Sequence, residues 1–140
     1  MTEDPLYVAK RLGVALEQAG ARWAVGGSVA SSVHGIPRST LDLDVIVALS
    51  PARVGDLAAA SVGEFEIDEE VLREQLRHGR SYNIFHTRTM TKVDLFPAVG
   101  PFERNQLDRS ADIGGVRVIA AEDSLLAKLD RALAETSGGF

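Results

Sequence analysis

Three aspartates that interrupt two apolar, strand-like segments are the residues of this chain best suited to chemistry. Two of them lie in the segment LDLDVIV (residues 41–47), and the third lies in KVDLF (residues 92–96). Acidic residues are disfavoured inside strands, and carboxylates are seldom buried unless they are paired or bound to metal. Successive side chains of a strand point to opposite faces, so Asp42 and Asp44 share one face while Leu41, Leu43 and Val45 point the other way, into a core.

If the two strands are neighbours, Asp94 can join Asp42 and Asp44 at one edge of the sheet. Three carboxylates at one place repel each other strongly, and a divalent cation removes that repulsion. Hard cations such as magnesium prefer oxygen ligands. The pattern therefore predicts a metal site, whereas the ordinary alternatives for an aspartate are a helix cap, a solvated surface position or a salt bridge to Arg38.

A glycine turn precedes the acidic strand. The segment WAVGGS (residues 23–28) is typical of a strand that runs into a turn, and residues 29–34 indicate a short helix closed by a glycine. Glycines let a backbone approach a ligand closely, and a helix N-terminus offers N–H groups to an anion. Gly26, Gly27 and Ser28 are therefore predicted to bind phosphate, the alternative being a plain strand–helix turn.

Two basic residues lie near the acids in the sequence. Arg38 precedes the acidic strand and could reach a phosphate, or it could simply neutralise one of the carboxylates. Lys92 lies two residues before Asp94, so the two side chains should share a face. A contact of Lys92 with either a phosphate or a carboxylate is expected.

Together these segments resemble the nucleotidyltransferase superfamily, which has the polymerase-beta-like fold. Its signature is a Gly-Gly/Ser turn, an Asp-x-Asp strand and a later third acid. The wider context GSVASSVHGIPRSTLDLD (residues 27–44), together with SYNIFH (81–86), KVDLF (92–96) and AEDSLLAKL (121–129), is similar to the small bacterial branch of AbiEii-type toxins and minimal nucleotidyltransferases. The resemblance runs from about residue 6 to residue 132.

The resemblance implies an enzyme that moves a nucleoside monophosphate from a nucleoside triphosphate (NTP) to an acceptor hydroxyl. Asp42 and Asp44 would hold two magnesium ions, and Asp94 would bind the ion next to the acceptor hydroxyl and could take its proton. Lys128 lies where related families carry a lysine and could neutralise the triphosphate, unless it is an ordinary exposed lysine. An RNA 3′ end is the favoured acceptor, in a toxin–antitoxin or phage-defence setting with a cognate antitoxin as partner; a protein side chain or a small molecule is the alternative acceptor.

Composition sets the limits of this interpretation. The chain has 140 residues, enough for one domain over residues 1–135, with 136–140 as a flexible tail. Without cysteine there is neither a disulfide framework nor a thiolate metal site. No signal peptide or membrane-length apolar run is present, so we expect a cytoplasmic protein without a membrane partner.

Charge is distributed unevenly along the chain. The net charge is −5, which argues against strong non-specific binding to nucleic acid. Residues 73–92, however, hold five basic residues against one acidic residue, a local balance of +4. A polyanionic acceptor could bind to this stretch. The alternative is that the stretch is a solvated helix face followed by a polar hairpin.

The order of predicted elements indicates an α+β domain, a nucleotidyltransferase-like small mixed sheet flanked by helices. Hydrophobic periodicity and turn residues predict helices at 5–20, 51–63, 68–79, 102–109 and from 122 onward. Strands are predicted at 22–26, 41–48, 64–67, 82–86, 92–96 and 116–120, with a tight turn at 113–116.

A second class of function stays open at this point. The chain could be a catalytically inactive binding module of the same fold, acting as a partner or antitoxin-type subunit. Related chains generally continue with further helices after the lysine-bearing one. If such helices are missing here, the last predicted helix could be left with partly exposed leucines at positions 125, 126, 129 and 133. An exposed apolar face of this kind would favour a homodimer.

Overall fold

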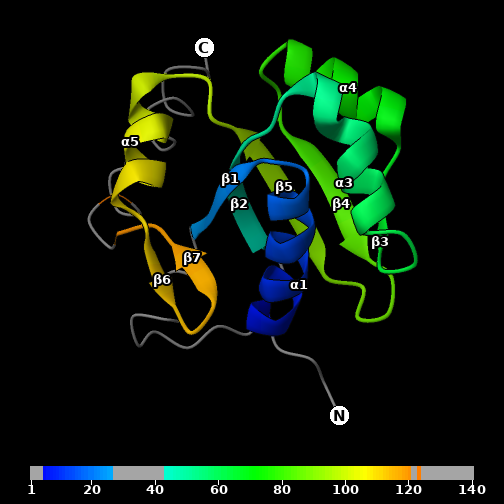
Figure 1. Cartoon of the computed structure of the whole chain (residues 1–140), viewed down its shortest axis with the longest axis horizontal. Coiled ribbons are helices and arrows are strands. Elements are labelled where there is room, and N and C mark those ends of the chain that lie inside the picture. Colours follow the sequence, from blue (N-terminus) through cyan, green and yellow to red (C-terminus); the bar gives the residue numbers. More distant parts are fainter. Residues whose placement is uncertain (1–4, 27–42, 121–122, 124–140) are drawn as a thin grey trace, which may run out of the picture.

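The order of the strands in the central sheet determines where the predicted site residues can meet. The computed structural model describes residues 5–26, 43–120 and 123, and within these ranges it contains a seven-stranded sheet and four α-helices (Figure 1). The strands are β1 (Arg22–Gly26), β2 (Leu43–Ala48), β3 (Phe65–Glu66), β4 (Tyr82–His86), β5 (Lys92–Pro97), β6 (Ala111–Ile113) and β7 (Val116–Val118). The helices are α1 (Pro5–Gln18), α3 (Val54–Ala60), α4 (Glu69–Arg77) and α5 (Pro101–Arg109), with a 3₁₀ turn, η1 (Pro51–Arg53), before α3.

The sheet is mixed, with the strand order β3-β4-β5-β2-β1-β7-β6. The central pair β2 and β5 is parallel, and so is the pair β1 and β7. The pairs β1–β2, β3–β4, β4–β5 and β6–β7 are antiparallel. The predicted α+β class is therefore confirmed, and the strand that carries Asp44 lies directly beside the strand that carries Asp94.

Helix α1 lies in front of the central strands, and α3 and α4 lie beside it over β4 (Figure 1). Val8, Leu12 and Leu16 recur at helical spacing and are fully buried, which confirms the predicted amphipathic helix. Gly13 lets α1 approach the sheet closely, because the ring of Trp23 in β1 lies where a Cβ of residue 13 would be. The indole Nε1 of Trp23 donates a hydrogen bond of 2.9 Å to Glu17 in the same helix.

Most predicted elements within the described ranges are present, with two differences. Residues 111–113 form the edge strand β6 rather than only the approach to a turn; all three are exposed, so no apolar alternation marks them in the sequence. The strand predicted at 64–67 is reduced to two residues, Phe65 and Glu66. The predicted short helix at 29–34, the last helix beyond residue 123 and the tail at 136–140 lie outside the described residues. Among the helices that are described, none is long and apolar enough to cross a bilayer.

Candidate active site

Asp44 and Asp94 lie side by side on the two central parallel strands. Leu43, Asp44 and Val45 of β2 are the register partners of Val93, Asp94 and Leu95 of β5. Adjacent strands are about 4.8 Å apart, and register partners point to the same face. The apolar neighbours are buried on the opposite face, whereas Asp44 is half-buried and the Asp94 side chain is 22% exposed.

The register extends this pair into a row across four strands. Gly26, the last residue of β1, is the partner of Asp44, and Asn83 of β4 is the partner of Asp94. The row therefore reads Gly26, Asp44, Asp94, Asn83. Sequence reasoning did not single out Asn83, although the predicted hairpin of residues 82–86 and 92–96 would have placed it beside Asp94 once its register was known.

Lys92 lies next to the carboxylate pair, as expected from its spacing to Asp94. Its Nζ is 4.0 Å from Oδ1 of Asp94, and its side chain is 37% exposed. An ammonium group at this distance offsets part of the negative charge of the pair. A phosphate group that approached Asp94 would also meet this cation.

Gly26 has a packing role in addition to any role in a phosphate turn. A Cβ added to Gly26 would lie 3.0 Å from Cδ1 of Ile119, whose side chain is buried. The Ile119 backbone N–H donates a 3.0 Å hydrogen bond to the carbonyl of Val25, which fixes the chain after β7 against the end of β1. Close packing at this point is therefore one physical reason for a glycine.

Five of the predicted site residues lie outside the described part of the chain: Asp42, Gly27, Ser28, Arg38 and Lys128. Within residues 5–26, 43–120 and 123, no three His, Cys, Asp or Glu side chains gather as a potential metal site. The two predicted ligands that are described do fit magnesium, since they present hard carboxylate oxygens on one face with an apolar frame behind them.

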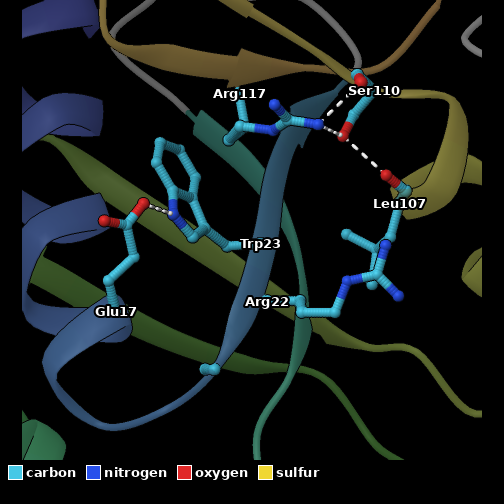
Figure 2. Close-up of a pocket in the computed structure, with 7 residues that line it drawn as sticks. Glu17, Arg22, Trp23, Leu107, Ser110 and Arg117 are labelled. Atoms are coloured by element: carbon cyan, nitrogen blue, oxygen red, sulfur yellow. Dashed lines mark hydrogen bonds between the residues drawn. The ribbon is translucent and has the colours of Figure 1, made fainter.

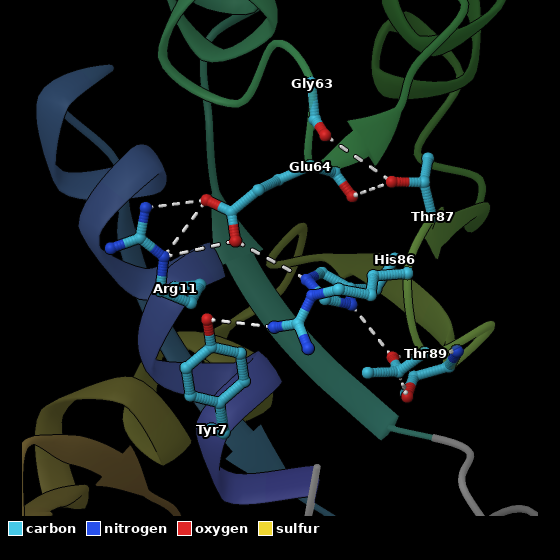
Figure 3. Close-up of polar contacts among 9 residues, drawn as sticks. Tyr7, Arg11, Gly63, Glu64, His86, Thr87 and Thr89 are labelled. Carbon is cyan, nitrogen blue, oxygen red and sulfur yellow. Dashed lines mark hydrogen bonds and ion pairs between the residues drawn. The ribbon is translucent and has the colours of Figure 1, made fainter. Parts of the chain in front are cut away.

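A buried histidine on the other face of the sheet is not part of this row. His86 is 1% exposed and alternates with Phe85, so it points toward α1. Its Nδ1 lies 2.8 Å from Oγ1 of Thr89, and its Nε2 lies 3.4 Å from the carboxylate of Glu64 (Figure 3). The ring is therefore unavailable to an acceptor on the carboxylate face.

Glu64 connects this histidine to α1. Its Oε1 accepts a 2.6 Å hydrogen bond from Nη2 of Arg11 (Figure 3). Hydrogen bonding from the Arg11 guanidinium, against the opposing effect of burial, lowers the pKa of Glu64, and the same contact raises the pKa of Arg11. Arg88 lies over the ring of Tyr7, with its carbon Cζ 5.6 Å from the ring centroid. These contacts attach the β3–β4 region to α1.

The basic stretch at 73–92 is not one continuous cationic surface. Arg73 pairs with Glu69 at 3.1 Å within α4. His78 lies 2.7 Å from Glu74, and hydrogen bonding from His78 lowers the pKa of Glu74. Neighbouring acids thus compensate this part of the stretch, as in the solvated-helix alternative.

A separate pocket of about 250 Å³ lies at the far end of β1 from Gly26 (Figure 2). Arg117 there donates hydrogen bonds of 2.7 and 2.9 Å to the carbonyl and hydroxyl oxygens of Ser110, and Arg22 pairs with Asp108 at 2.7 Å. Gly26 lies four positions along β1 from Arg22, a distance of about 13 Å. The pocket is therefore distinct from the carboxylate row. Its lining consists of Glu17, Ala21, Arg22, Trp23, Leu107, Ser110 and Arg117.

Of three comparisons with known proteins, only the comparison with solved structures finds a match. No protein-family model matches the sequence, and no curated protein matches it. Among solved structures, the crystal structure of a proposed nucleotidyltransferase from Thermotoga maritima matches with a TM-score of 0.62, over 96% of this chain and 88% of the Thermotoga chain. This chain has a nucleotidyltransferase-like fold. Sequence identity is 12%, so the likeness concerns the fold and does not extend to the AbiEii-type branch.

Proposed function

We propose that this protein is a magnesium-dependent nucleotidyltransferase that moves a nucleoside monophosphate from an NTP to the hydroxyl group of an RNA 3′ end. The observation that carries the proposal is the register pairing of Asp44 with Asp94 on a sheet of nucleotidyltransferase-like fold. Two half-buried carboxylates at neighbouring positions repel unless a cation lies between them. Lys92, 4.0 Å from Asp94, adds a cation suited to a phosphate.

In the proposed reaction the acceptor oxygen forms a bond to the α-phosphorus of the NTP. The bond from that phosphorus to the oxygen bridging toward the β-phosphate breaks, and pyrophosphate leaves with the electron pair. Asp94 takes the proton of the acceptor hydroxyl. Bound magnesium would supply neutralisation of the charge on the attacking and leaving oxygens.

The other predicted residues complete this proposal. Asp42 and Asp44 hold the magnesium ions together with Asp94, and Gly26, Gly27 and Ser28 bind the triphosphate. Three basic residues neutralise the triphosphate: Arg38, Lys92 and Lys128. The setting in a toxin–antitoxin or phage-defence pair stays a prediction from the sequence.

Label transfer tests the proposal directly. The protein is incubated with each α-labelled NTP, magnesium and total RNA, and label on RNA is measured. Asp94→Asn should reduce transfer at least about 100-fold, because a positioned general base typically contributes about 10²–10⁴-fold to the rate. Asp108→Asn is the matched control, since Asp108 is an exposed aspartate that pairs with Arg22 at the far end of the sheet.

Two outcomes contradict the proposal. Label on RNA that Asp94→Asn leaves unchanged would place the reaction elsewhere. Binding of magnesium and NTP without transfer to any acceptor would support the inactive binding module instead.

A further inference from the structure

The carboxylate face continues onto β4 and presents a small group of side chains suited to a nucleotide. Asn83 is the register partner of Asp94, and Phe85 is the register partner of Lys92. Register partners on antiparallel strands share a face, so these four side chains lie on one surface. Phe85 is 39% exposed on this face, although β4 is an interior strand that pairs with β3 on one side and β5 on the other.

We propose that Asn83, Phe85 and Lys92 form an acceptor platform that holds the terminal nucleotide of a single-stranded RNA. This inference rests on the proposed function, because it assigns the acceptor side of the same site. Phe85 stacks on the base, Asn83 offers an amide donor and acceptor to the base or ribose, and Lys92 contacts a phosphate.

The charged residues on the two sides of Phe85 determine on which side of the ring the RNA phosphates lie. Glu66 of β3 is the partner of Phe85 on the outer side, and Lys92 of β5 is its partner on the inner side. A phosphate is repelled by the first and attracted by the second. The sugar–phosphate backbone therefore runs past Lys92 on β5, while the base lies over β4.

The space available agrees with this arrangement. A pocket of about 580 Å³ opens beside Phe85 and Asn83, and it can admit a nucleobase. Phe85 is two residues along and one strand across from Asp94, about 8 Å, a separation that one nucleotide can bridge. The residues that line the pocket are Glu66, Ile67, Asp68, Tyr82, Asn83 and Phe85.

The test uses a fluorescent single-stranded RNA oligonucleotide and measures two quantities, its binding by anisotropy and the KM for RNA in label transfer. Phe85→Ala should weaken RNA binding and raise the KM for RNA, each by about fivefold to 150-fold, which is the effect of losing one base–aromatic stack. Phe85→Tyr, which keeps an aromatic ring, should stay within about twofold of the wild type, whereas Phe85→Leu should behave like Phe85→Ala. The KM for NTP should be unchanged in all three variants.

Ile113→Ala is the matched control, because Ile113 is an exposed apolar strand residue (43%) at the opposite edge of the sheet. It should leave RNA binding and both KM values unchanged. Equal RNA binding by Phe85→Ala and Ile113→Ala would overturn the acceptor platform even if transfer occurs. If no transfer occurs, the proposed function fails separately, and anisotropy alone decides the platform: binding that depends on the Phe85 ring supports it, and absent or ring-independent binding refutes it.

Discussion

Asp44 and Asp94 are register partners on adjacent parallel strands, with buried leucine and valine residues at the flanking positions. The strands cannot separate to relax the two carboxylates, because their apolar neighbours pack into the core behind them. The close approach of the two carboxylates is therefore built into the native sheet, and a cation such as the ammonium group of Lys92, 4.0 Å from Asp94, lowers its cost.

The first prediction concerns the metal. Asp44→Asn should abolish the rise in melting temperature that magnesium causes in the wild type, because it removes one of the two described carboxylates that would bind the ion, and a ligand that binds only the folded state stabilises it. Thermal unfolding with and without magnesium measures the effect.

Asp108→Asn serves as the comparison for this experiment. It removes a surface ion pair with Arg22, which should change stability by less than about 1 kcal/mol and leave the magnesium shift intact. A wild-type protein that shows no magnesium shift, or an Asp44→Asn variant with the full shift, would argue against the metal site.

Gly13→Ala should destabilise the protein, although alanine is the better helix former by about 1 kcal/mol. An added Cβ would lie 2.6 Å from Cη2 of the Trp23 ring, which is 5% exposed and held by its hydrogen bond to Glu17. Overpacking of this kind costs about 1–3 kcal/mol and should outweigh the propensity gain. Urea denaturation measures the change, with Val14→Ala on the exposed side of α1 as the control. A Gly13→Ala variant more stable than the wild type would show that α1 can move away from the sheet.

Gly26→Ala should cost about 1 kcal/mol through its contact with Ile119, independently of any ligand. Ile119→Val removes the Cδ1 atom that lies 3.0 Å from the added Cβ, so the two changes together should cost less than the sum of the separate costs. A double-mutant cycle of unfolding free energies gives the coupling. Additive costs would show that the contact with Ile119 is not the source of the Gly26→Ala penalty.

Glu64→Gln should reduce stability at pH 7 by about 1 kcal/mol, and the loss should shrink in acid. The Arg11 contact lowers the pKa of Glu64 in the folded state, so its stabilisation is present above the unfolded pKa of about 4.3 and disappears as the pH falls through the folded value. Unfolding free energies between pH 7 and pH 3 measure the difference. Arg11→Gln should flatten the same part of the profile, and a Glu64→Gln penalty that is equal at both ends would contradict the assignment.

Local patterns in the sequence predict which face a side chain occupies better than which strand lies next to it. Alternation predicts that Asp44 points to one face of its strand and that its apolar neighbours point to the opposite, buried face. Helical spacing predicts α1 from Leu12 and Leu16. The neighbour of β2 depends on packing between residues far apart in the chain, which no local pattern encodes. The sequence therefore predicts the pairing of Asp44 with Asp94 only if the two strands are neighbours, a condition that the strand order of the sheet meets.

Two features show where the local patterns mislead. His86 lies in the basic stretch of residues 73–92, yet it alternates with exposed Phe85 and is buried beside Phe65 and Tyr7. Strand β6 has no alternation because all its residues are exposed, and it exists through its hairpin with β7. In both cases the position in the sheet, rather than residue type, decides the environment.

The parallel pairing of β2 with β5 has a consequence for synthesis of the protein. A chain emerging from the ribosome exposes Asp44 about fifty residues before Asp94, and the hairpin of β4 and β5 must dock on β2 before the two acids meet. Contacts of such long sequence separation form late in folding. The nascent chain therefore cannot bring Asp44 and Asp94 together until β5 has been synthesised and has joined β2.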